Sequence, residues 1–317
     1  MKIEQGLTIA WVMTLLLFAS APAAAEAPQR VTVLLDWFLN PDHAPLIVAL
    51  QKGYFHEQGL EVHLKAPANP NDPPKLVAAG RADLAVSYQP QHHLHIDQGL
   101  PLMRIATLVA TPLNSLVVLA DGKVQSLADL KGKTIGYSVG GFETVLLKTL
   151  LSGVGLDLDD VRLVNVNFSL SPSLMAGKTD AVIGAFRNFE LNQMVIEGRP
   201  GRAFFIEEHG IPAYDELILI CHRDRVNDPF VRPFVDALAA GVQYLVNHPQ
   251  ESWQHFVAYQ KSLDDELNRR AWADTLPRFA LRPGALDGHR YERFAEFLQK
   301  NGMTGRAPPL DQYAVEP

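Results

Sequence analysis

Cysteine is almost absent from the 317-residue chain, which contains one thiol, Cys221. A single cysteine excludes an internal disulfide framework and any zinc or iron–sulfur site made of several thiolates. Cys221 lies in an apolar segment, where we expect it to be part of the core. The chain is long enough to bury a stable core without cross-links, and its length indicates two domains.

Basic residues are also in the minority. Lys and Arg number 28 against 35 Asp and Glu, which gives a formal net charge of −7. This balance argues against nucleic acid as a partner and against electrostatic attachment to a membrane. Common catalytic motifs are missing too, among them Gly-x-Ser-x-Gly, His-Glu-x-x-His and the phosphate-binding P-loop. These absences favour a binding protein that is not an enzyme and uses neither metal nor cofactor.

The N-terminal segment has the pattern of an export signal. An apolar run extends from Leu7 to Ala21, and small residues at 23–25 offer a cleavage site after Ala25. The run is short for a membrane span, although an uncleaved anchor helix is the alternative. We expect residues 1–25 to be a signal peptide and the mature chain to be a free protein outside the cytoplasm, in the periplasm of a Gram-negative source.

The mature chain repeats one α/β rhythm. Apolar runs at 31–35, 60–64 and 82–86 predict strands, and helical patterns between them end at glycines. The order returns with strands at 134–137, 161–166 and 181–184 and helices at 143–151 and 171–176. Strands that are separated by helices predict parallel pairing.

We therefore predict an α/β fold of two lobes, each a mostly parallel sheet flanked by helices. Lobe 1 comprises residues 26–117 and 218–317, and lobe 2 comprises residues 118–217. Strands at 116–119 and 217–220 are expected to cross between the lobes. After 227–229 the pattern becomes helical, and these amphipathic helices are expected to pack on lobe 1.

Ligands of open parallel sheets bind at the loops that follow the carboxyl ends of the strands. The first such loop, 36–43, contains Trp37, which offers a flat face for stacking, and Asn40 and His43, which offer hydrogen bonds. The alternative is that Trp37 belongs to the core and that Asn40 only forms a turn.

The loop after the third strand contains Tyr88 and three histidines. Tyr88 stands at the strand end, where a ligand contact is expected. His92 and His95 would share one face of a helix, which permits a metal site, but His93 would point elsewhere. We favour a solvated helix start for the three histidines and predict no metal.

Two loops of lobe 2 complete the candidate site. Gly140, Gly141 and Phe142 connect a strand to a helix N-terminus, whose free N–H groups can bind an anion or a carbonyl. The second loop supplies Phe186, Arg187, Asn188 and Glu190. A glutamate there can recognise the amino group and ring nitrogen of an aminopyrimidine together. The alternative for Glu190 is a salt bridge with Arg187 or an exposed position on the next helix.

Several segments resemble a known family. They are 35–43 (LDWFLNPDH), 52–55 (KGYF), 58–60 (QGL), 74–80 (PKLVAAG), 130–137 (LKGKTIGY) and 186–191 (FRNFEL). Together they resemble the periplasmic solute-binding proteins that deliver thiamine pyrimidine precursors to an ABC transporter. The glycine-containing motifs are shared with sulfonate, taurine and nitrate binders, whereas 36–43 and 186–190 are more selective. The similarity extends from about residue 31 to residue 220.

The resemblance implies a two-lobed type II periplasmic-binding fold that closes on an aminopyrimidine with a hydroxymethyl or formylaminomethyl arm. It also implies a partner, an ABC permease in the inner membrane, and we expect a monomer. In that interpretation Trp37 and Tyr88 flank the ring and Glu190 pairs with its amino side. Asn40 and the amides of 140–141 would hold the polar arm.

Two other functions remain open at this point. One is a binder of an alkyl sulfonate, taurine or nitrate, for which Arg187 is the candidate counter-ion. The other is a pyrimidine synthase, since eukaryotic enzymes of the same fold use a lysine and a histidine in this region. Alignment through Gly80 places Ser87 and Gln91 at those two positions, which disfavours the enzyme.

Overall fold

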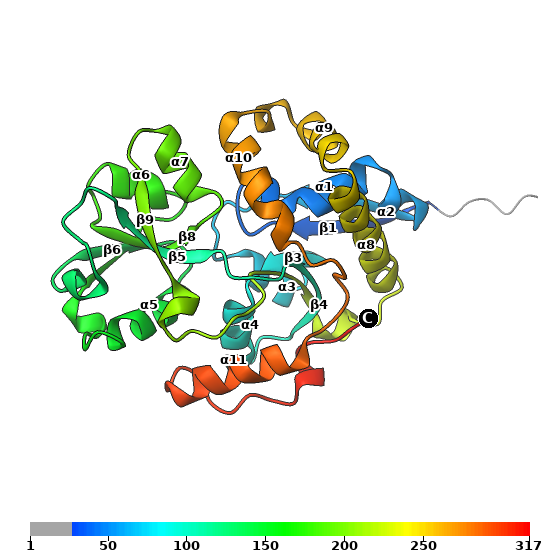
Figure 1. The fold of residues 1–317 in the computed structure, drawn as a ribbon. Helices are drawn as coiled ribbons and strands as arrows, with labels where there is room; N and C mark the ends of the chain where they lie inside the picture. The colour runs from blue at the N-terminus through cyan, green and yellow to red at the C-terminus, as the bar shows by residue number, and fades with distance from the viewer. Residues whose placement is uncertain (1–26) are drawn as a thin grey trace, which may run out of the picture.

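The computed structural model describes residues 27–317, which form two α/β lobes, each built on a five-stranded sheet (Figure 1). The predicted signal peptide, 1–25, lies outside the described residues. Among residues 27–317, no helix is both long and apolar enough to span a bilayer.

The first sheet has the strand order β2-β1-β3-β10-β4. Its strands are β1 (Gln29–Leu34), β2 (Leu60–Lys65), β3 (Leu84–Ser87), β4 (Leu102–Val109) and β10 (Leu217–His222). Strand β1 pairs in parallel with β2 and β3, whereas β10 runs antiparallel to both of its neighbours.

The second sheet repeats this plan with the order β7-β6-β8-β5-β9. Its strands are β5 (Asn114–Leu119), β6 (Thr134–Tyr137), β7 (Arg162–Asn165), β8 (Ala181–Phe186) and β9 (Gly201–Phe205). Here β5 takes the antiparallel place that β10 has in the first sheet. The predicted α/β class and the parallel pairing within each repeat are confirmed.

Helices cover both sheets. In the first lobe they are α1 (Ala44–Gln51), α2 (Tyr54–Glu57), α3 (Pro73–Ala78), α4 (Gln89–Asp97), α8 (Val231–Asn247), α9 (Pro249–Tyr259), α10 (Glu266–Thr275) and α11 (Gly288–Lys300). In the second lobe they are α5 (Phe142–Ser152), α6 (Leu170–Met175) and α7 (Glu190–Ile196). Among the helices after residue 230, α8 packs against α1 and α11 lies beside α4 of the first lobe, whereas α10 also contacts α7 of the second lobe (Figure 1).

Small side chains allow α8 to lie close to α1. A Cβ at Gly241 of α8 would stand 2.7 Å from the Cβ of Ala49 and 2.8 Å from the carbonyl oxygen of Pro45. Glycine therefore lets the two helices meet, and α1 becomes buried along most of its length.

Two segments connect the lobes, residues 110–113 before β5 and residues 206–216 before β10. The Glu216 carboxylate joins them, since it accepts the backbone N–H groups of Leu113 at 2.6 Å and Asn114 at 2.9 Å. The predicted boundary at 117/118 falls inside β5, a strand that belongs entirely to the second sheet. Strands β5 and β10 are thus sheet members, and the chain crosses in the segments that precede them.

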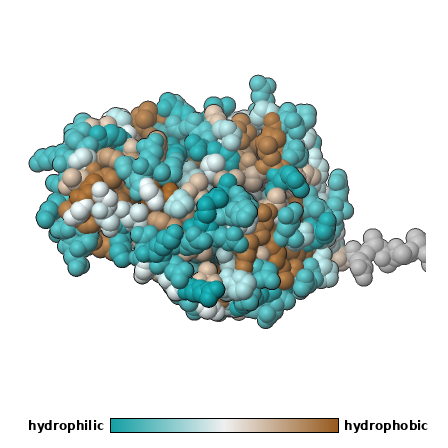
Figure 2. All heavy atoms as spheres, turned by 60° about the horizontal axis from the view of Figure 1, so that its bottom comes forward, coloured by the Kyte–Doolittle hydropathy of each residue, from teal (hydrophilic) through white to brown (hydrophobic). Residues whose placement is uncertain are grey.

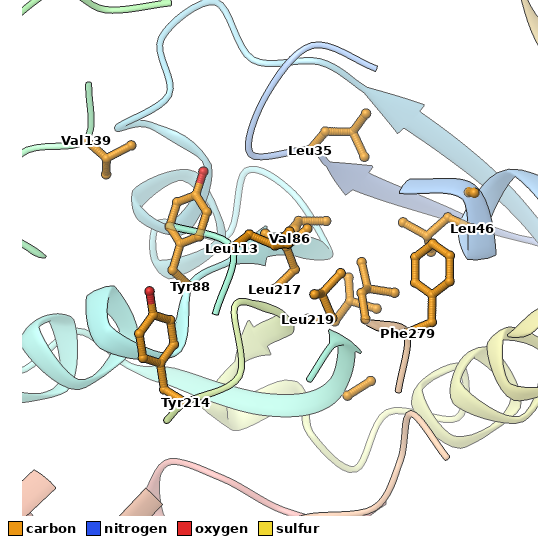
Figure 3. Close-up of a cluster of buried hydrophobic side chains, with 14 of the residues drawn as sticks. Leu35, Leu46, Val86, Tyr88, Leu113, Val139, Tyr214, Leu217, Leu219 and Phe279 are labelled. Atoms are coloured by element: carbon orange, nitrogen blue, oxygen red, sulfur yellow. The ribbon is translucent and has the colours of Figure 1, made fainter. Parts of the chain in front are cut away.

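The core of the first lobe contains apolar side chains from the sheet and from the connecting segments, including Leu35, Val86, Leu217 and Leu219 (Figure 3). Cys221 is fully buried there, as predicted. The face shown in Figure 2 is mostly hydrophilic, with hydrophobic areas on it. Large exposed apolar side chains include Phe38 and Leu281.

Candidate functional site

A cavity lies between the lobes, at the carboxyl ends of β1, β3, β6 and β8. The space between its lining side chains is about 410 Å³ when the solvent at its mouth is included. Both lobes contribute to its lining: Asp36, Trp37, Asn40, Asp42, Tyr88, Val139, Phe142, Glu143, Leu170, Gly184, Phe186, Phe189 and Glu190. The position follows from the topology, because these loops leave parallel strands at one edge.

Asp36 is the centre of a hydrogen-bond network in the first lobe. The Tyr88 hydroxyl donates to Asp36 Oδ2 at 2.8 Å, and His43 Nε2 lies 2.8 Å from Asp36 Oδ1. His43 Nδ1 accepts the backbone N–H of Asn40 at 3.3 Å, so the histidine proton belongs on Nε2, which donates to Asp36. The network fixes the Tyr88 ring on the wall of the cavity, and His43 supports it from behind.

Asn40 and Asp42 belong to a 3₁₀ turn, Pro41–His43, that follows this network. Asn40 Oδ1 accepts the backbone N–H of Asp42 at 2.8 Å, and its Nδ2 donates to the carbonyl oxygen of Phe38 at 3.2 Å. The turn itself therefore occupies the amide of Asn40. Asp42 Oδ1 accepts hydrogen bonds from Asn188 Nδ2 at 2.6 Å and Thr275 Oγ1 at 3.1 Å, and burial raises the pKa of Asp42 to about 6.

Glu143, on the first turn of α5, projects into the cavity region from the second lobe. Its Oε2 accepts the backbone N–H of Ser138 at 2.7 Å. A Cβ at Gly184 would stand 2.3 Å from Glu143 Oε1, and the φ of Gly184 is +100°, so only glycine permits this approach. Burial raises the pKa of Glu143 to about 8, against the opposing effect of the backbone N–H groups of Ser138 and Val139. Near pH 7 the protonated acid predominates.

Glu190 begins α7 and is 6% exposed. Its Oε2 accepts the backbone N–H of Phe186 at 2.7 Å. Burial raises the pKa of Glu190 to about 8, and the nearby charge of Asp42 acts in the same direction. The protonated carboxyl can donate through its hydroxyl and accept through its carbonyl oxygen.

The lining is acidic and contains no cation. Four carboxyl groups line the cavity, and none of the lining residues within 27–317 is a lysine, arginine or histidine. An anion would enter this environment without a counter-ion, at a high cost in desolvation. The arrangement suits a neutral or cationic ligand with several hydrogen-bonding atoms.

Aromatic rings form the apolar part of the wall. Tyr88 of the first lobe stacks on Phe142 of the second, with ring centroids 4.9 Å apart and an interplanar angle of 26°. Phe186 meets Tyr88 edge to face at 6.2 Å. Trp37 crosses to the second lobe, where its ring lies 4.6 Å from that of Phe168. Flat rings on both sides suit a planar heterocycle.

Six of the predicted site residues line the cavity: Trp37, Asn40, Tyr88, Phe142, Phe186 and Glu190. Five do not: His43, Gly140, Gly141, Arg187 and Asn188.

Three of the five form contacts elsewhere in the protein. The N–H of Gly140 donates to Asn71 Oδ1 at 2.8 Å, and Asn188 bonds to Asp42. The Arg187 guanidinium forms a bidentate pair with Glu207 at 2.6 and 2.9 Å and lies over the Phe205 ring. Its charge is therefore used within the second lobe.

Sequence reasoning did not select seven lining residues: Asp36, Asp42, Val139, Glu143, Leu170, Gly184 and Phe189. Asp36 and Asp42 stand in the same loop as Trp37, so the loop itself was the available signal. Glu143 stands at a strand–helix junction, where a carboxylate is itself a site candidate, so its position was the available signal.

The histidine cluster is not solvated, contrary to the prediction. His92, His93 and His95 are buried, because α11 and the C-terminal segment cover α4. The His93 ring stacks on Phe294 of α11, and His92 Nε2 donates to the carbonyl oxygen of Tyr313 at 2.8 Å. Burial lowers the pKa of His92 to about 4 and that of His93 to about 3, so both are neutral core residues. In the described part of the chain no group of His, Cys, Asp and Glu side chains could hold a metal.

Comparison with known proteins agrees with this geometry. The family model described as NMT1/THI5 like matches residues 40–252. A Haemophilus influenzae protein whose name assigns it to thiamine biosynthesis is 53% identical over 291 residues, which cover 92% of this chain and 93% of the relative. The formylaminopyrimidine-binding protein of Halalkalibacterium halodurans is 37% identical over 245 residues, which cover 77% and 73%.

More distant similarities extend to an enzyme and to a solved structure. A Saccharomyces cerevisiae 4-amino-5-hydroxymethyl-2-methylpyrimidine phosphate synthase is 27% identical over 256 residues, covering 77% of this chain and 75% of the enzyme. The alkanesulfonate-binding protein of Xanthomonas axonopodis superimposes with a TM-score of 0.72 at 16% identity, covering 92% and 99%. That likeness identifies the fold, that of periplasmic binding proteins. By the extent of the family match and the identity of its relatives, the chain belongs to the NMT1/THI5-like family.

Proposed function

We propose that this protein is the extracytoplasmic solute-binding component of an ABC importer and that it binds a thiamine pyrimidine precursor between its lobes. The ligand is a hydroxymethyl- or formylaminomethyl-substituted 4-amino-2-methylpyrimidine, which the protein delivers to the permease for thiamine salvage. The observation that carries the proposal is the acidic, cation-free cavity with aromatic walls. The formylaminopyrimidine-binding relative supports the same ligand class.

Glu190 is the group proposed to recognise the ring. An aminopyrimidine presents an amino N–H beside a ring nitrogen that accepts, and a protonated carboxyl presents the complementary acceptor and donor. Burial keeps Glu190 protonated near neutral pH in the free protein, and in the proposed complex this proton moves to the ring nitrogen, so that the two hydrogen bonds become charge-assisted while the pair as a whole carries no net charge. Trp37 and Tyr88 are proposed to flank the ring.

An anionic ligand fits poorly. Sulfonate, taurine or nitrate recognition requires a free cation or several free N–H donors. Arg187 pairs with Glu207, and Asn71 accepts from the N–H of Gly140. These two candidate donors for an anion are thus occupied, while four carboxyls line the cavity.

A synthase activity is not supported by the residues at 87 and 91. Ser87 Oγ donates to Gln91 Oε1 at 3.2 Å, and both side chains are buried. A serine hydroxyl and a glutamine amide do not supply the amine nucleophile or the imidazole of the resembling enzymes. The proposed role is therefore binding.

Closure of the lobes on the ligand would form the state that a permease recognises. Asn71 joins the lobes in this structure through Ser138 and Gly140 at 3.2 and 2.8 Å. A ligand that contacts both lobes binds the closed state more tightly and so shifts the population toward it.

Calorimetric titration with the two aminopyrimidines and with an alkyl sulfonate tests the proposal. Glu190→Gln is expected to weaken aminopyrimidine binding by roughly 10- to 150-fold, the scale of a charge-assisted hydrogen bond, because an amide can pair with the ring edge but cannot transfer a proton to it. Glu197→Gln, an exposed change at the end of the same helix, serves as the matched control and should leave the affinity unchanged. Binding of the sulfonate alone would overturn the ligand assignment.

A further inference from the structure

Two polar atoms in the cavity lining are buried without a hydrogen-bond partner in the described part of the chain. They are Asp42 Oδ2 and Trp37 Nε1. Asp42 is 1% exposed and Trp37 is 8% exposed. Buried polar atoms in native proteins are almost always satisfied, so an unpaired acceptor and an unpaired donor in one cavity require an explanation.

Asp42 has one oxygen in use and one free. Asn188 and Thr275 both donate to Oδ1, which leaves Oδ2 for a group outside the protein. The ionisable groups around it are His43, Asp36 and Glu190. Burial raises the pKa of Asp42 to about 6, and in its ionised form Oδ2 accepts hydrogen bonds.

Trp37 has the opposite requirement. An indole N–H can only donate, and the Trp37 ring is held by contacts with the rings of Phe38 and Phe168. Its Nε1 therefore needs an acceptor from a molecule in the cavity. A molecule that satisfies both residues must supply a hydrogen-bond donor to Asp42 Oδ2 and an acceptor to Trp37 Nε1.

Of the other groups expected to hold the polar arm, Asn40 and Gly140 already form hydrogen bonds within the protein, and Gly141 does not line the cavity. Both ends of the Asn40 amide bond within its own turn, and the N–H of Gly140 donates to Asn71. The unpaired atoms of Asp42 and Trp37 are left as the better candidates.

We propose that Asp42 and Trp37 form the subsite for the polar arm of the pyrimidine, with Asp42 Oδ2 accepting from its N–H or O–H and Trp37 Nε1 donating to its oxygen. This inference rests on the proposed function, and within it the subsite would determine which substituted aminopyrimidine binds most tightly. A formylaminomethyl arm supplies an N–H donor and a carbonyl acceptor, whereas a methyl group supplies neither.

The subsite also connects the arm to lobe closure. Asn188 belongs to the second lobe and Asp42 to the first, and the bond between them ends on the carboxylate that receives the arm. A ligand that donates to Oδ2 would therefore bind the same carboxylate through which Asp42 contacts the second lobe.

The test uses three 4-amino-2-methylpyrimidines that differ only at ring position 5, where they carry methyl, hydroxymethyl or formylaminomethyl. Isothermal titration calorimetry measures each with the wild type, Asp42→Asn, Trp37→Phe and Glu190→Gln. The wild type should bind the formylaminomethyl compound at least about 10-fold more tightly than the methyl compound, the effect of one hydrogen-bonded group.

Asp42→Asn keeps an oxygen for Asn188 and Thr275 but can place an amide donor where Oδ2 was. The preference for formylaminomethyl over methyl should disappear, while the hydroxymethyl compound loses less because a hydroxyl can also accept. Trp37→Phe keeps an aromatic ring and should reduce the same preference, which provides a second reading if Asp42→Asn folds poorly. Glu190→Gln should weaken all three compounds equally, because they share the ring edge.

An unchanged formylaminomethyl-to-methyl ratio in Asp42→Asn, or in Trp37→Phe where Asp42→Asn does not fold, would overturn the subsite and leave the proposed function standing. Failure of the wild type to bind any of the three would instead overturn the proposed function.

Discussion

Two regions of this molecule contain buried acidic side chains in contrasting surroundings. In the cavity, Asp42, Glu143 and Glu190 have no basic partner, and burial raises the pKa of each. At the other region, Asp215 accepts from Thr107 Oγ1 at 2.8 Å and pairs with Arg290.

Arg104 completes that second region. It is fully buried and donates to Thr107 Oγ1 and to carbonyl oxygens near the C-terminus, among them those of Ala285 and Val315. The cations there fasten the last residues of the chain to the first sheet. The carboxyl that a cation balances in this region is thus part of the architecture, whereas the carboxyls of the cavity are available to a ligand.

The largest effect is expected from Arg104→Met. The change leaves several buried carbonyl oxygens without a donor and should lower the free energy of unfolding by roughly 3–5 kcal/mol. Urea unfolding measures the loss, and ligand affinity at permissive temperature should change by less than about twofold because the cavity is not touched. A loss below about 1 kcal/mol would show that the cation is not structural.

A paired substitution sharpens the comparison. Asp215→Asn removes the charge that balances Arg290 and should cost about 1.5–3 kcal/mol of stability without altering ligand affinity. Glu190→Gln should do the reverse, weakening the ligand while changing stability by no more than about 0.5 kcal/mol. The two regions would not differ as described if both variants lost stability equally.

A buried carboxyl of the cavity should make the stability of the protein decrease as the pH rises. The pKa of Glu143 is about 8 in the folded protein and has an ordinary value of 4.5. The folded state therefore holds the proton more tightly than the unfolded state does. The resulting contribution to the free energy of unfolding is complete below pH 4.5 and is lost as the pH rises toward 8. Its slope is at most about 1.4 kcal/mol per pH unit.

Glu143→Gln should flatten that decline between pH 5 and 8, because glutamine mimics the protonated acid beside Gly184. Thermal unfolding of the ligand-free protein at several pH values measures it, with Glu197→Gln as the exposed control. An unaltered slope in Glu143→Gln would mean that Glu143 is ionised in the folded state.

The smallest effect is expected from Gly140→Ala. A Cβ there would meet Asn71 Oδ1 at 3.7 Å, an ordinary contact, and the N–H of Gly140 already donates to that atom. Ligand affinity should stay within about twofold of the wild type in a calorimetric titration. A loss of 10-fold or more would return the 140–141 amides to the ligand site.

Local sequence predicted much of the fold. The repeated α/β rhythm located β6 to the residue, and glycine caps located the ends of α1 and α3 within a few residues. Local sequence did not predict β4 or β9. It also did not predict the burial of His92, whose ring bonds to the carbonyl oxygen of Tyr313, more than 200 positions away. A polar sequence such as that of α4 gives no sign that a distant segment will cover it.

The candidate site, too, could be predicted only in part from the sequence. Strand ends identified the loops that line the cavity, since topology determines where loops meet. Which side chain in a loop faces the cavity depends on contacts made far along the chain, as Arg187 with Glu207 and Gly140 with Asn71 show. Residue type alone therefore selected Arg187 and missed Asp42.

The most direct test of the account is a calorimetric comparison, at neutral pH, of the hydroxymethyl aminopyrimidine with its phosphate ester. The account predicts sub-micromolar binding of the uncharged compound and binding of the ester at least about 100-fold weaker, because a dianion would face four carboxyls and no cation. Equal or tighter binding of the ester would contradict the central claim that this cavity is built for an uncharged aminopyrimidine.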